Sequence, residues 1–236
     1  MGATPRPKLG DVNDTRSLSS YFRRKRDRLL RAFILQERAF KPGLFRILDV
    51  GGTPTYWQRV GLDFLTRHDI EVICVGPPTD GGAAVARVAV EPGDGLALAF
   101  ADLSFDLVHS NSVIEHVGRS REMQRFASEV RRLAPAYYIQ TPNFWFPIDP
   151  HFYRVPMFHW LPRPLRVALV RRSRVGLQPP TVDYLRALRV VEYAVLLDRG
   201  QLRAHFPDAT IVTERFALMP KSLIALRSTL ANGASE

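Results

Sequence analysis

Two groups of residues in this chain are of the types that do chemistry. The first is a short turn, Asp49-Val50-Gly51-Gly52-Thr53, which ends an apolar run. Glycines in such a turn let the backbone approach a ligand closely, and a helix that follows offers free N–H groups. The second group consists of His116, His151 and His159. They are candidate general bases, because the imidazole pKa lies near the pH at which most enzymes work.

The glycine spacing in this turn discriminates between cofactors. A dinucleotide fingerprint needs glycines at its first, third and sixth places, and counting from Gly51 these places hold Gly51, Thr53 and Tyr56. Tyr56 would block the close helix–strand contact that the last glycine permits. A phosphate-loop Lys-Ser/Thr pair is also missing. The turn therefore disfavours a pyrophosphate cofactor, but it does not disfavour a cofactor that has an amino-acid carboxylate and an adenosine and no phosphates.

Alternating strand and helix patterns position these residues. Apolar runs predict strands at Arg46–Val50, Ile70–Val75, Val85–Val90, Phe105–Ser110 and Tyr137–Thr141, and helical spacing covers Tyr56–Arg67 and Ser120–Leu133. Near-continuous apolar strands alternating with helices indicate a parallel sheet covered on both faces. Two last strands, Thr210–Leu218 and Ser222–Arg227, are joined by Met219-Pro220-Lys221, a link short enough to make them antiparallel. The predicted fold class is α/β, with a doubly wound, mostly parallel seven-stranded sheet and a C-terminal antiparallel strand pair.

The remaining segments predict the domain organisation. Residues 1–20 are polar and form a flexible N-terminal arm, and a helix follows from Phe22 until Pro42-Gly43. A single domain is expected over residues 21–228, with a Pro/aromatic lid inserted at about 142–182, and residues 229–236 form a tail. The lid cannot be one regular element, because Pro142 to Pro180 holds 8 of the chain's 18 prolines. A further helix is expected at Asp183–His205.

Composition excludes several classes of protein. The single cysteine, Cys74, excludes a disulfide framework and a cysteine-cluster metal site. No uncharged apolar stretch reaches the ~18 residues that span a bilayer, and the N-terminus lacks a secretory apolar core, so a cytoplasmic location is expected. The net charge of +10 permits nucleic acid, anionic lipid or an acidic substrate as a partner.

Several of these segments resemble the motifs of one enzyme family. The sequence ILDVGG (Ile47–Gly52) is similar to the first motif of class I S-adenosylmethionine-dependent methyltransferases. GDGLALAF (Gly93–Phe100) and SFDLVHSNSVIEHV (Ser104–Val117) resemble the third- and fourth-strand motifs of the type 11 branch. The resemblance covers about Tyr21 to Arg227. It implies a Rossmann-like methyltransferase fold, a methyltransferase activity and S-adenosyl-L-methionine as the cofactor.

The resemblance also implies roles for individual residues. The cofactor-binding residues that it implies are Asp49, Gly51, Gly52, Thr53, Asp94 and Asn111. The first four would border the methionine part of the cofactor, Asp94 would face the adenine amine, and Asn111 would lie at the cofactor's edge. Glu115 and His116 would open toward the substrate.

One departure from the family pattern concerns the ribose. The acidic residue that usually holds both ribose hydroxyls at the end of the second strand is replaced by Gly76, and Asp80 is a nearby carboxylate. Thr53, where the family often has glycine, is a milder departure. The two departures leave open weak cofactor binding or a methyltransferase fold that no longer catalyses.

Methyl transfer to a hydroxyl needs a base, and His116 and His151 are the predicted catalytic residues. Asp149, His151 and His159 also have metal-ligand chemistry, but their spacing matches no known signature and proline-broken loops hold ligands poorly, so no metal site is predicted.

The favoured acceptor is a small molecule or a glycan or lipid-linked compound methylated at oxygen. The basic, Trp-containing stretch Met157–Val175 would suit peripheral contact with an anionic membrane. Two alternatives remain open: an RNA-modifying methyltransferase, for which no RNA-binding module is visible, and a non-catalytic binding protein of methyltransferase shape.

Overall fold

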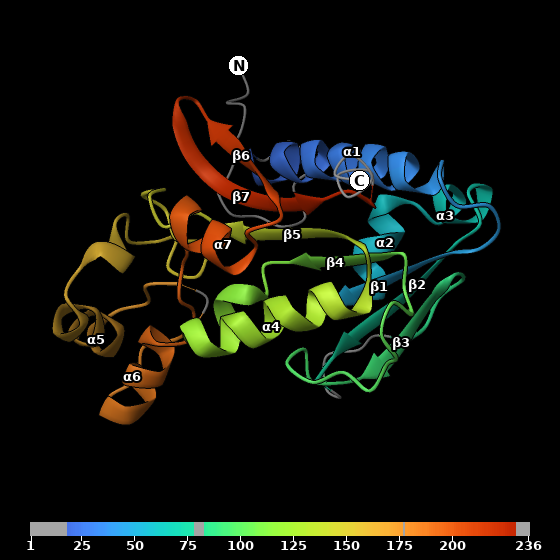
Figure 1. Ribbon diagram of the computed structural model, residues 1–236. Helices are drawn as coiled ribbons and strands as arrows, with labels where there is room; N and C mark the ends of the chain where they lie inside the picture. The colour runs from blue at the N-terminus through green and yellow to red at the C-terminus, as the bar shows by residue number, and fades with distance from the viewer. Residues whose placement is uncertain (1–17, 78–82, 177, 230–236) are drawn as a thin grey trace, which may run out of the picture. The chain divides into compact units, whose positions relative to one another are not determined.

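The computed structural model describes residues 18–77, 83–176 and 178–229, with side chains from residue 22 onward (Figure 1). These residues fall into two compact units, 18–42 and 43–229. The predicted arm (1–20) and tail (229–236) lie almost wholly outside the described residues, so the domain boundaries stay predictions.

The first unit is one long helix. α1 spans Leu18–Arg38, which confirms the helix predicted from the apolar spacing that begins at Phe22. The helix ends shortly before Pro42, which cannot continue it, and Gly43 follows with a positive φ of 80°.

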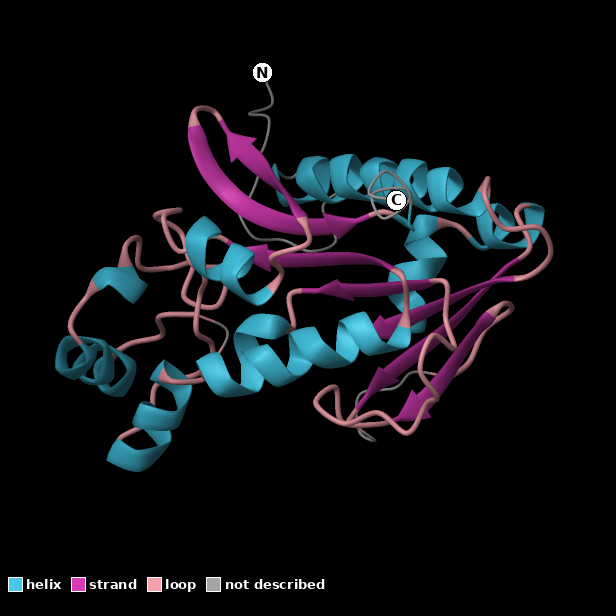
Figure 2. Ribbon diagram, in the orientation of Figure 1, coloured by secondary structure: helices cyan, strands magenta, loops and turns pink. Residues whose placement is uncertain are grey.

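The second unit is built on one seven-stranded sheet (Figure 2). Its strands are β1 Phe45–Val50, β2 Ile70–Gly76, β3 Val88–Pro92, β4 Leu107–Asn111, β5 Ala136–Pro142, β6 Thr210–Phe216 and β7 Met219–Arg227. They lie in the order β3-β2-β1-β4-β5-β7-β6. β1 to β5 pair in parallel, whereas β7 is antiparallel to both β5 and β6. The predicted fold class is confirmed.

Short helices connect the strands. They are α2 Pro54–Val60, α3 Leu62–Arg67, η1 Ile114–His116 (a 3₁₀ turn), α4 Ser120–Leu133, η2 Phe158–Trp160 (also 3₁₀), α5 Arg163–Arg172, α6 Tyr184–Val191 and α7 Arg199–His205. α4 has the predicted bounds. Its buried residues are spaced three and four apart, so one face of the helix enters the sheet's core: Met123, Phe126, Ala127, Val130 and Leu133. None of the described helices has the length and hydropathy needed to cross a membrane.

The predicted helix over Asp183–His205 is wrong in its middle. Residues 192–198 leave the helical path between α6 and α7 because their backbone groups bond to other segments. The Val195 N–H donates to the carbonyl of Glu115 over 2.8 Å, and the carbonyl of Leu197 accepts from the Phe144 N–H over 2.9 Å. Asp198 and Gln201 then form a capping box that starts α7.

Smaller corrections concern turns. The helix predicted over Tyr56–Arg67 is divided into α2 and α3 at Gly61, whose φ is 118°. The third strand begins at Val88 instead of Val85, because Arg87 takes a φ of 65° in a turn. The final hairpin turns at Ala217-Leu218, since Met219 already pairs with Phe216.

The segment predicted to be a lid combines η2 and α5 with irregular chain, as its prolines require. It has its own small core, in which Phe152 and Phe158 stack with ring centroids 4.1 Å apart. Val167 and Val170 of α5 join this core together with Ala187 of α6. The irregular chain is thus held in shape by apolar packing.

The register of β1 against β4 places Asp49 directly beside His109. Both side chains are only 1% exposed. One carboxylate oxygen of Asp49 lies 2.7 Å from His109 Nδ1, and the other accepts the Trp57 indole N–H over 2.7 Å. The Tyr56 hydroxyl lies 3.3 Å from His109 Nε2. This buried polar cluster ties two strands to the first turn of α2.

The cluster explains both glycines of the turn above it. Gly51 has a φ of 74° and donates its N–H to the carbonyl of Val75 over 2.6 Å. A Cβ at Gly52 would collide with the carboxylate of Asp49. The turn therefore needs a left-handed residue first and a residue without a side chain second.

We predict that Asp49→Ala destabilises the protein strongly. Removing the carboxylate leaves the buried Trp57 indole and the His109 ring without their acceptor, at about 1–3 kcal/mol for each unpaired group. The free energy of unfolding, from denaturant titration followed by circular dichroism, measures the loss. Asp63→Ala, at an exposed position in the first turn of α3, is the control and should change stability by less than about 1 kcal/mol. Equal stability of the two variants would contradict the role of the cluster.

Candidate active site

The strand order reverses between β1 and β4, and ligands of open α/β sheets bind beyond the carboxyl ends of the strands at such a point. A cavity of about 570 Å³, here called the switch-point cavity, lies there. It is lined by Val50, Gly51, Val75, Gly76, Pro77, Pro92, Gly93, Asp94, Gly95, Val113 and Val117. The walls are mostly apolar, and among the described residues that line the cavity Asp94 is the one with a carboxylate.

Asp94 makes a hydrogen bond within its own turn and also lines this cavity. Its Oδ1 accepts the N–H of Leu96 over 3.0 Å, which holds the turn after β3. The same side chain lines the cavity. At Gly76 a Cβ would meet no described atom within 4 Å, so space stands open at the position where the resemblance led us to expect an acid. Asp80 lies outside the described residues.

Of the other predicted cofactor residues, Gly51 lines this cavity, and Gly52 follows it in the turn. Asp49 lies buried below the turn and is not among the lining residues. Thr53 is the N-cap of α2, and its hydroxyl accepts the Tyr56 N–H over 3.4 Å. Its φ of −135° is extended, so this position does not need glycine. Asn111 ends β4, half-buried, and is not among the lining residues.

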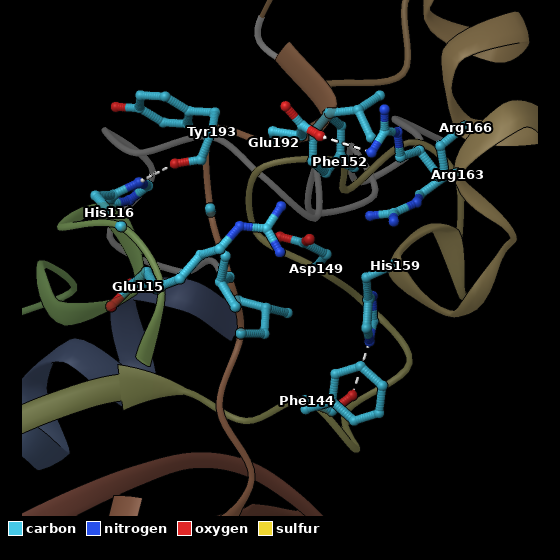
Figure 3. A pocket seen from close by; sticks show the side chains of 16 residues that line it. Glu115, His116, Phe144, Asp149, Phe152, His159, Arg163, Arg166, Glu192 and Tyr193 are labelled. Carbon is cyan, nitrogen blue, oxygen red and sulfur yellow. Dashed lines mark hydrogen bonds and ion pairs between the residues drawn. The ribbon is translucent and has the colours of Figure 1, made fainter. Parts of the chain in front are cut away.

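A second cavity, of about 540 Å³, lies under the lid and is here called the lid cavity (Figure 3). Its lining comes from the turn after β4, from the lid and from the segment after α6. The residues are Glu115, His116, Gly118, Arg119, Phe144, Asp149, Phe152, His159, Arg163, Arg166, Val191, Glu192, Tyr193, Ala194, Val195 and Leu196. Figure 3 shows His116 beside the backbone of Tyr193, and Arg163 and Arg166 on the opposite side.

The two predicted catalytic histidines are brought together at the edge of this cavity. Their Nε2 atoms lie 3.1 Å apart, although 35 residues separate them in sequence. His116 Nδ1 lies 3.0 Å from the carbonyl oxygen of Tyr193, and His151 Nδ1 lies 2.7 Å from Asp149 Oδ1. Burial lowers the pKa of His116 below its ordinary value. Both rings are therefore oriented by an acceptor on their far side.

His159 is not part of this pair. Its Nε2 bonds to the carbonyl of Phe144 over 2.7 Å, as Figure 3 shows. Its ring lies edge-on to Phe144 at a centroid distance of 5.5 Å. This histidine therefore fixes the lid wall.

Glu115 is a buried carboxyl group beside the histidine pair. It is 1% exposed, and its Oε2 accepts the Thr141 hydroxyl over 2.9 Å. Oε1 is buried without a hydrogen-bond partner among the described residues. Burial raises the pKa of Glu115 to about 7. A carboxyl oxygen buried without a partner is uncommon and demands an explanation.

Arginines give the lid cavity its basic side. Arg163 pairs with Glu192 over 3.2 Å. Arg166 is partly buried, and burial followed by the charge of Arg163 lowers its pKa. Its Nε is buried without a hydrogen-bond partner in the described part of the chain. The sequence had marked Arg166 only as part of the basic stretch Met157–Val175 and had not signalled Tyr193, because only the folded lid brings these two residues to the cavity.

The two cavities share one turn. Val113 and Val117 line the switch-point cavity, whereas Glu115 and His116, which lie between them, line the lid cavity. A ligand in one cavity is therefore separated from a ligand in the other by a single 3₁₀ turn.

Residues 77–135 match a family described as "Methyltransferase domain". This segment runs from the end of β2 past α4 and contains Asp94, Asn111 and His116. Two curated proteins of Mycobacterium tuberculosis are also similar: Uncharacterized protein MT1557 of strain CDC 1551 / Oshkosh and Uncharacterized protein Rv1509 of strain H37Rv. Each is 28% identical over 130 residues, which are 52% of this chain and 44% of the relative. The chain thus spans less than half the length of the curated relatives it matches.

Among solved structures, the CurJ carbon methyltransferase has the same fold, with a TM-score of 0.52 and 14% identity over 86% of this chain and 54% of that chain. The fold and the match over residues 77–135 agree with the motifs after β1, β3 and β4. The chain thus has the fold of class I S-adenosylmethionine-dependent methyltransferases, and its residues 77–135 are similar to a methyltransferase domain.

Proposed function

We propose that this chain transfers a methyl group from S-adenosyl-L-methionine to a hydroxyl of a small-molecule, glycan or lipid-linked acceptor. The observation that carries the proposal is the turn shared by the two cavities. A donor in the switch-point cavity and an acceptor in the lid cavity would meet across residues 113–117, where His116 lies. Methyl transfer depends chiefly on such alignment of donor and acceptor.

The switch-point cavity suits an uncharged nucleoside. Its volume lies within the range of small-ligand pockets, and apolar walls such as Val75 and Val113 suit the adenine faces. Asp94 would accept a hydrogen bond from the adenine amine, and the Gly51-Gly52 turn would border the methionine part. When bound, the cofactor supplies an electrophilic methyl group on a sulfonium. The open space at Gly76 leaves the ribose without the family's usual carboxylate.

The histidine pair at the lid cavity could take a proton from the acceptor. The Nδ1 of His116 faces a carbonyl oxygen, which only accepts, so this nitrogen carries the hydrogen and Nε2 presents a lone pair. His151 is oriented by Asp149 in the same sense. An acceptor hydroxyl placed beside these two histidines would lose its proton to an Nε2 atom of the pair. Arg166, whose Nε has no hydrogen-bond partner among the described residues, would bind an anionic group of the acceptor.

Contact with an anionic membrane stays a prediction. Val167 and Val170, part of the stretch that predicted it, are buried in the lid core. Trp160 and Leu165 remain exposed near several arginines. Together with Met157, which is also exposed, these side chains are available for a lipid surface.

We predict that Asp94→Asn weakens the binding of S-adenosylhomocysteine by about tenfold or more, because a charged hydrogen bond to the adenine amine is lost. Isothermal titration calorimetry measures the dissociation constant. The asparagine retains an oxygen for the Leu96 N–H, so the turn should persist. Glu91→Gln, at an exposed position on β3, is the matched control. Failure of the unmutated protein to bind the nucleoside at millimolar concentration would contradict the proposed function and favour a non-catalytic binding protein.

We predict that His116→Ala lowers kcat by about 100-fold or more, the usual effect of losing a base, with the cofactor's dissociation constant nearly unchanged. Methyl transfer from labelled cofactor to a panel of hydroxylated acceptors provides the rate. His159→Ala is the comparison, since that histidine lines the same cavity but bonds to the Phe144 carbonyl. Normal turnover by His116→Ala would reduce this residue to a packing role. Labelling of RNA in place of the small acceptors would select the RNA-modifying alternative.

A further inference from the structure

We propose that Glu115, His116 and His151 bind one divalent transition-metal ion at the edge of the lid cavity. One ligand atom from each of the three side chains lies within 4.8 Å of the other two. Two imidazole nitrogens and a carboxylate oxygen form a ligand set typical of zinc and its first-row neighbours. The sequence alone predicted no metal site. The three residues weighed there as metal ligands were Asp149, His151 and His159, a different set.

The orientation of the two histidine rings supports a bound cation. Each Nδ1 faces an oxygen that only accepts, the carbonyl of Tyr193 for His116 and the carboxylate of Asp149 for His151. In the neutral tautomers both hydrogens are therefore on Nδ1, and the two unprotonated Nε2 atoms lie 3.1 Å apart. Two lone pairs at this distance repel unless a proton or a cation lies between them.

The separation suits a shared cation. With metal–nitrogen distances of about 2.0–2.1 Å, nitrogens 3.1 Å apart subtend an angle of roughly 100° at the ion. That angle lies between the octahedral and tetrahedral values.

The environment of Glu115, the third proposed ligand, also supports a bound cation. Glu115 is nine-tenths buried or more, and its Oε1 has no hydrogen-bond partner in the described part of the chain. Thr141 donates to the other oxygen and fixes the carboxyl group. A single shared proton between the histidines would leave this oxygen unpartnered, whereas a cation would satisfy all three groups.

The surroundings match those of metal sites. A histidine ligand usually donates its second ring hydrogen to a carboxylate or a backbone carbonyl, which fixes the ring and raises its basicity. His151 has the first arrangement and His116 has the second. Asp149 also accepts the backbone N–H of His151 over 2.8 Å, so the supporting carboxylate is itself held in place.

The site opens on the lid cavity, because Glu115 and His116 belong to its lining. Three protein ligands leave a coordination position for an oxygen of the acceptor. This part of the inference rests on the proposed function. Under that function the bound ion would lower the pKa of the acceptor hydroxyl, whose proton would pass to solvent, and the two histidines would be ligands of the ion instead of the base.

Metal binding is tested on the full chain without cofactor or acceptor. Chelator-treated protein is titrated with Zn²⁺ by calorimetry, and with Co²⁺ by visible absorption, which reports nitrogen and oxygen ligation directly. We expect one ion per chain. His151→Ala and Glu115→Gln should each weaken Zn²⁺ binding by more than about tenfold, and Asp149→Asn by about 10- to 100-fold through its effect on His151.

His159→Ala is the matched control, a histidine of the same cavity that should leave Zn²⁺ affinity unchanged. His116→Ala provides a second ligand variant if the buried Glu115→Gln fails to fold, as judged by its circular dichroism melt. Absence of stoichiometric Zn²⁺ and Co²⁺ binding, or equal affinity in His151→Ala and the unmutated protein, would overturn the proposal and leave a shared proton between the rings. Because S-adenosylhomocysteine binding is measured separately, failure of the methyltransferase assignment and failure of the metal site give different results.

Discussion

The site depends on the reversal of strand order between β1 and β4. β2 and β3 extend the sheet on one side of this point and β5 on the other, so the loops that follow β1 and β4 diverge and leave space between them. The buried cluster of Asp49, His109 and Trp57 holds the two diverging strands at the base of that space. The Gly51-Gly52 turn rests directly on this cluster. A polar interaction inside the sheet thus sets the floor of the switch-point cavity, although none of the three polar side chains lines it.

The lid cavity depends on a different constraint, the interruption between α6 and α7. A continuous helix over residues 184–205 would satisfy its own backbone groups and leave the turn after β4 uncovered. The extended segment 192–198 instead bonds to Glu115 and Phe144, and it places the Tyr193 carbonyl on His116. The energy lost in unwinding a helix is offset by these tertiary hydrogen bonds and by the capping box at Asp198. The same break that closes the cavity also orients one of its histidines.

The sequence predicted those elements that are specified by short-range patterns along the chain. Continuous apolar strands, the periodic face of α4 and the turn glycines all follow from short-range patterns, and their predicted positions overlap with those in the structure, although β3 is displaced to Val88–Pro92. The break after Val191 could have been suspected from the Asp198–Gln201 capping box. Contacts that depend on pairing register, such as Asp49 with His109, are not encoded in local spacing. Neither is the meeting of His116 with His151, which depends on the packing of the lid's own core.

The turn between Val113 and Gly118 shows why two adjacent residues have such different environments. In a 3₁₀ turn the Cα–Cβ bonds of successive residues are about 120° apart, so neighbouring side chains leave the backbone in different directions even where both reach one site. Glu115 is buried and bonded to Thr141 of β5, whereas His116 lies beside the Tyr193 carbonyl, and both line the lid cavity. Val113 and Val117, which flank the turn, line the switch-point cavity. One turn thereby serves the sheet, the lid and the cofactor side at once, and any shift of the turn would move all three together. This coupling makes the turn after β4, rather than the glycine motif after β1, the element on which the geometry between donor and acceptor depends.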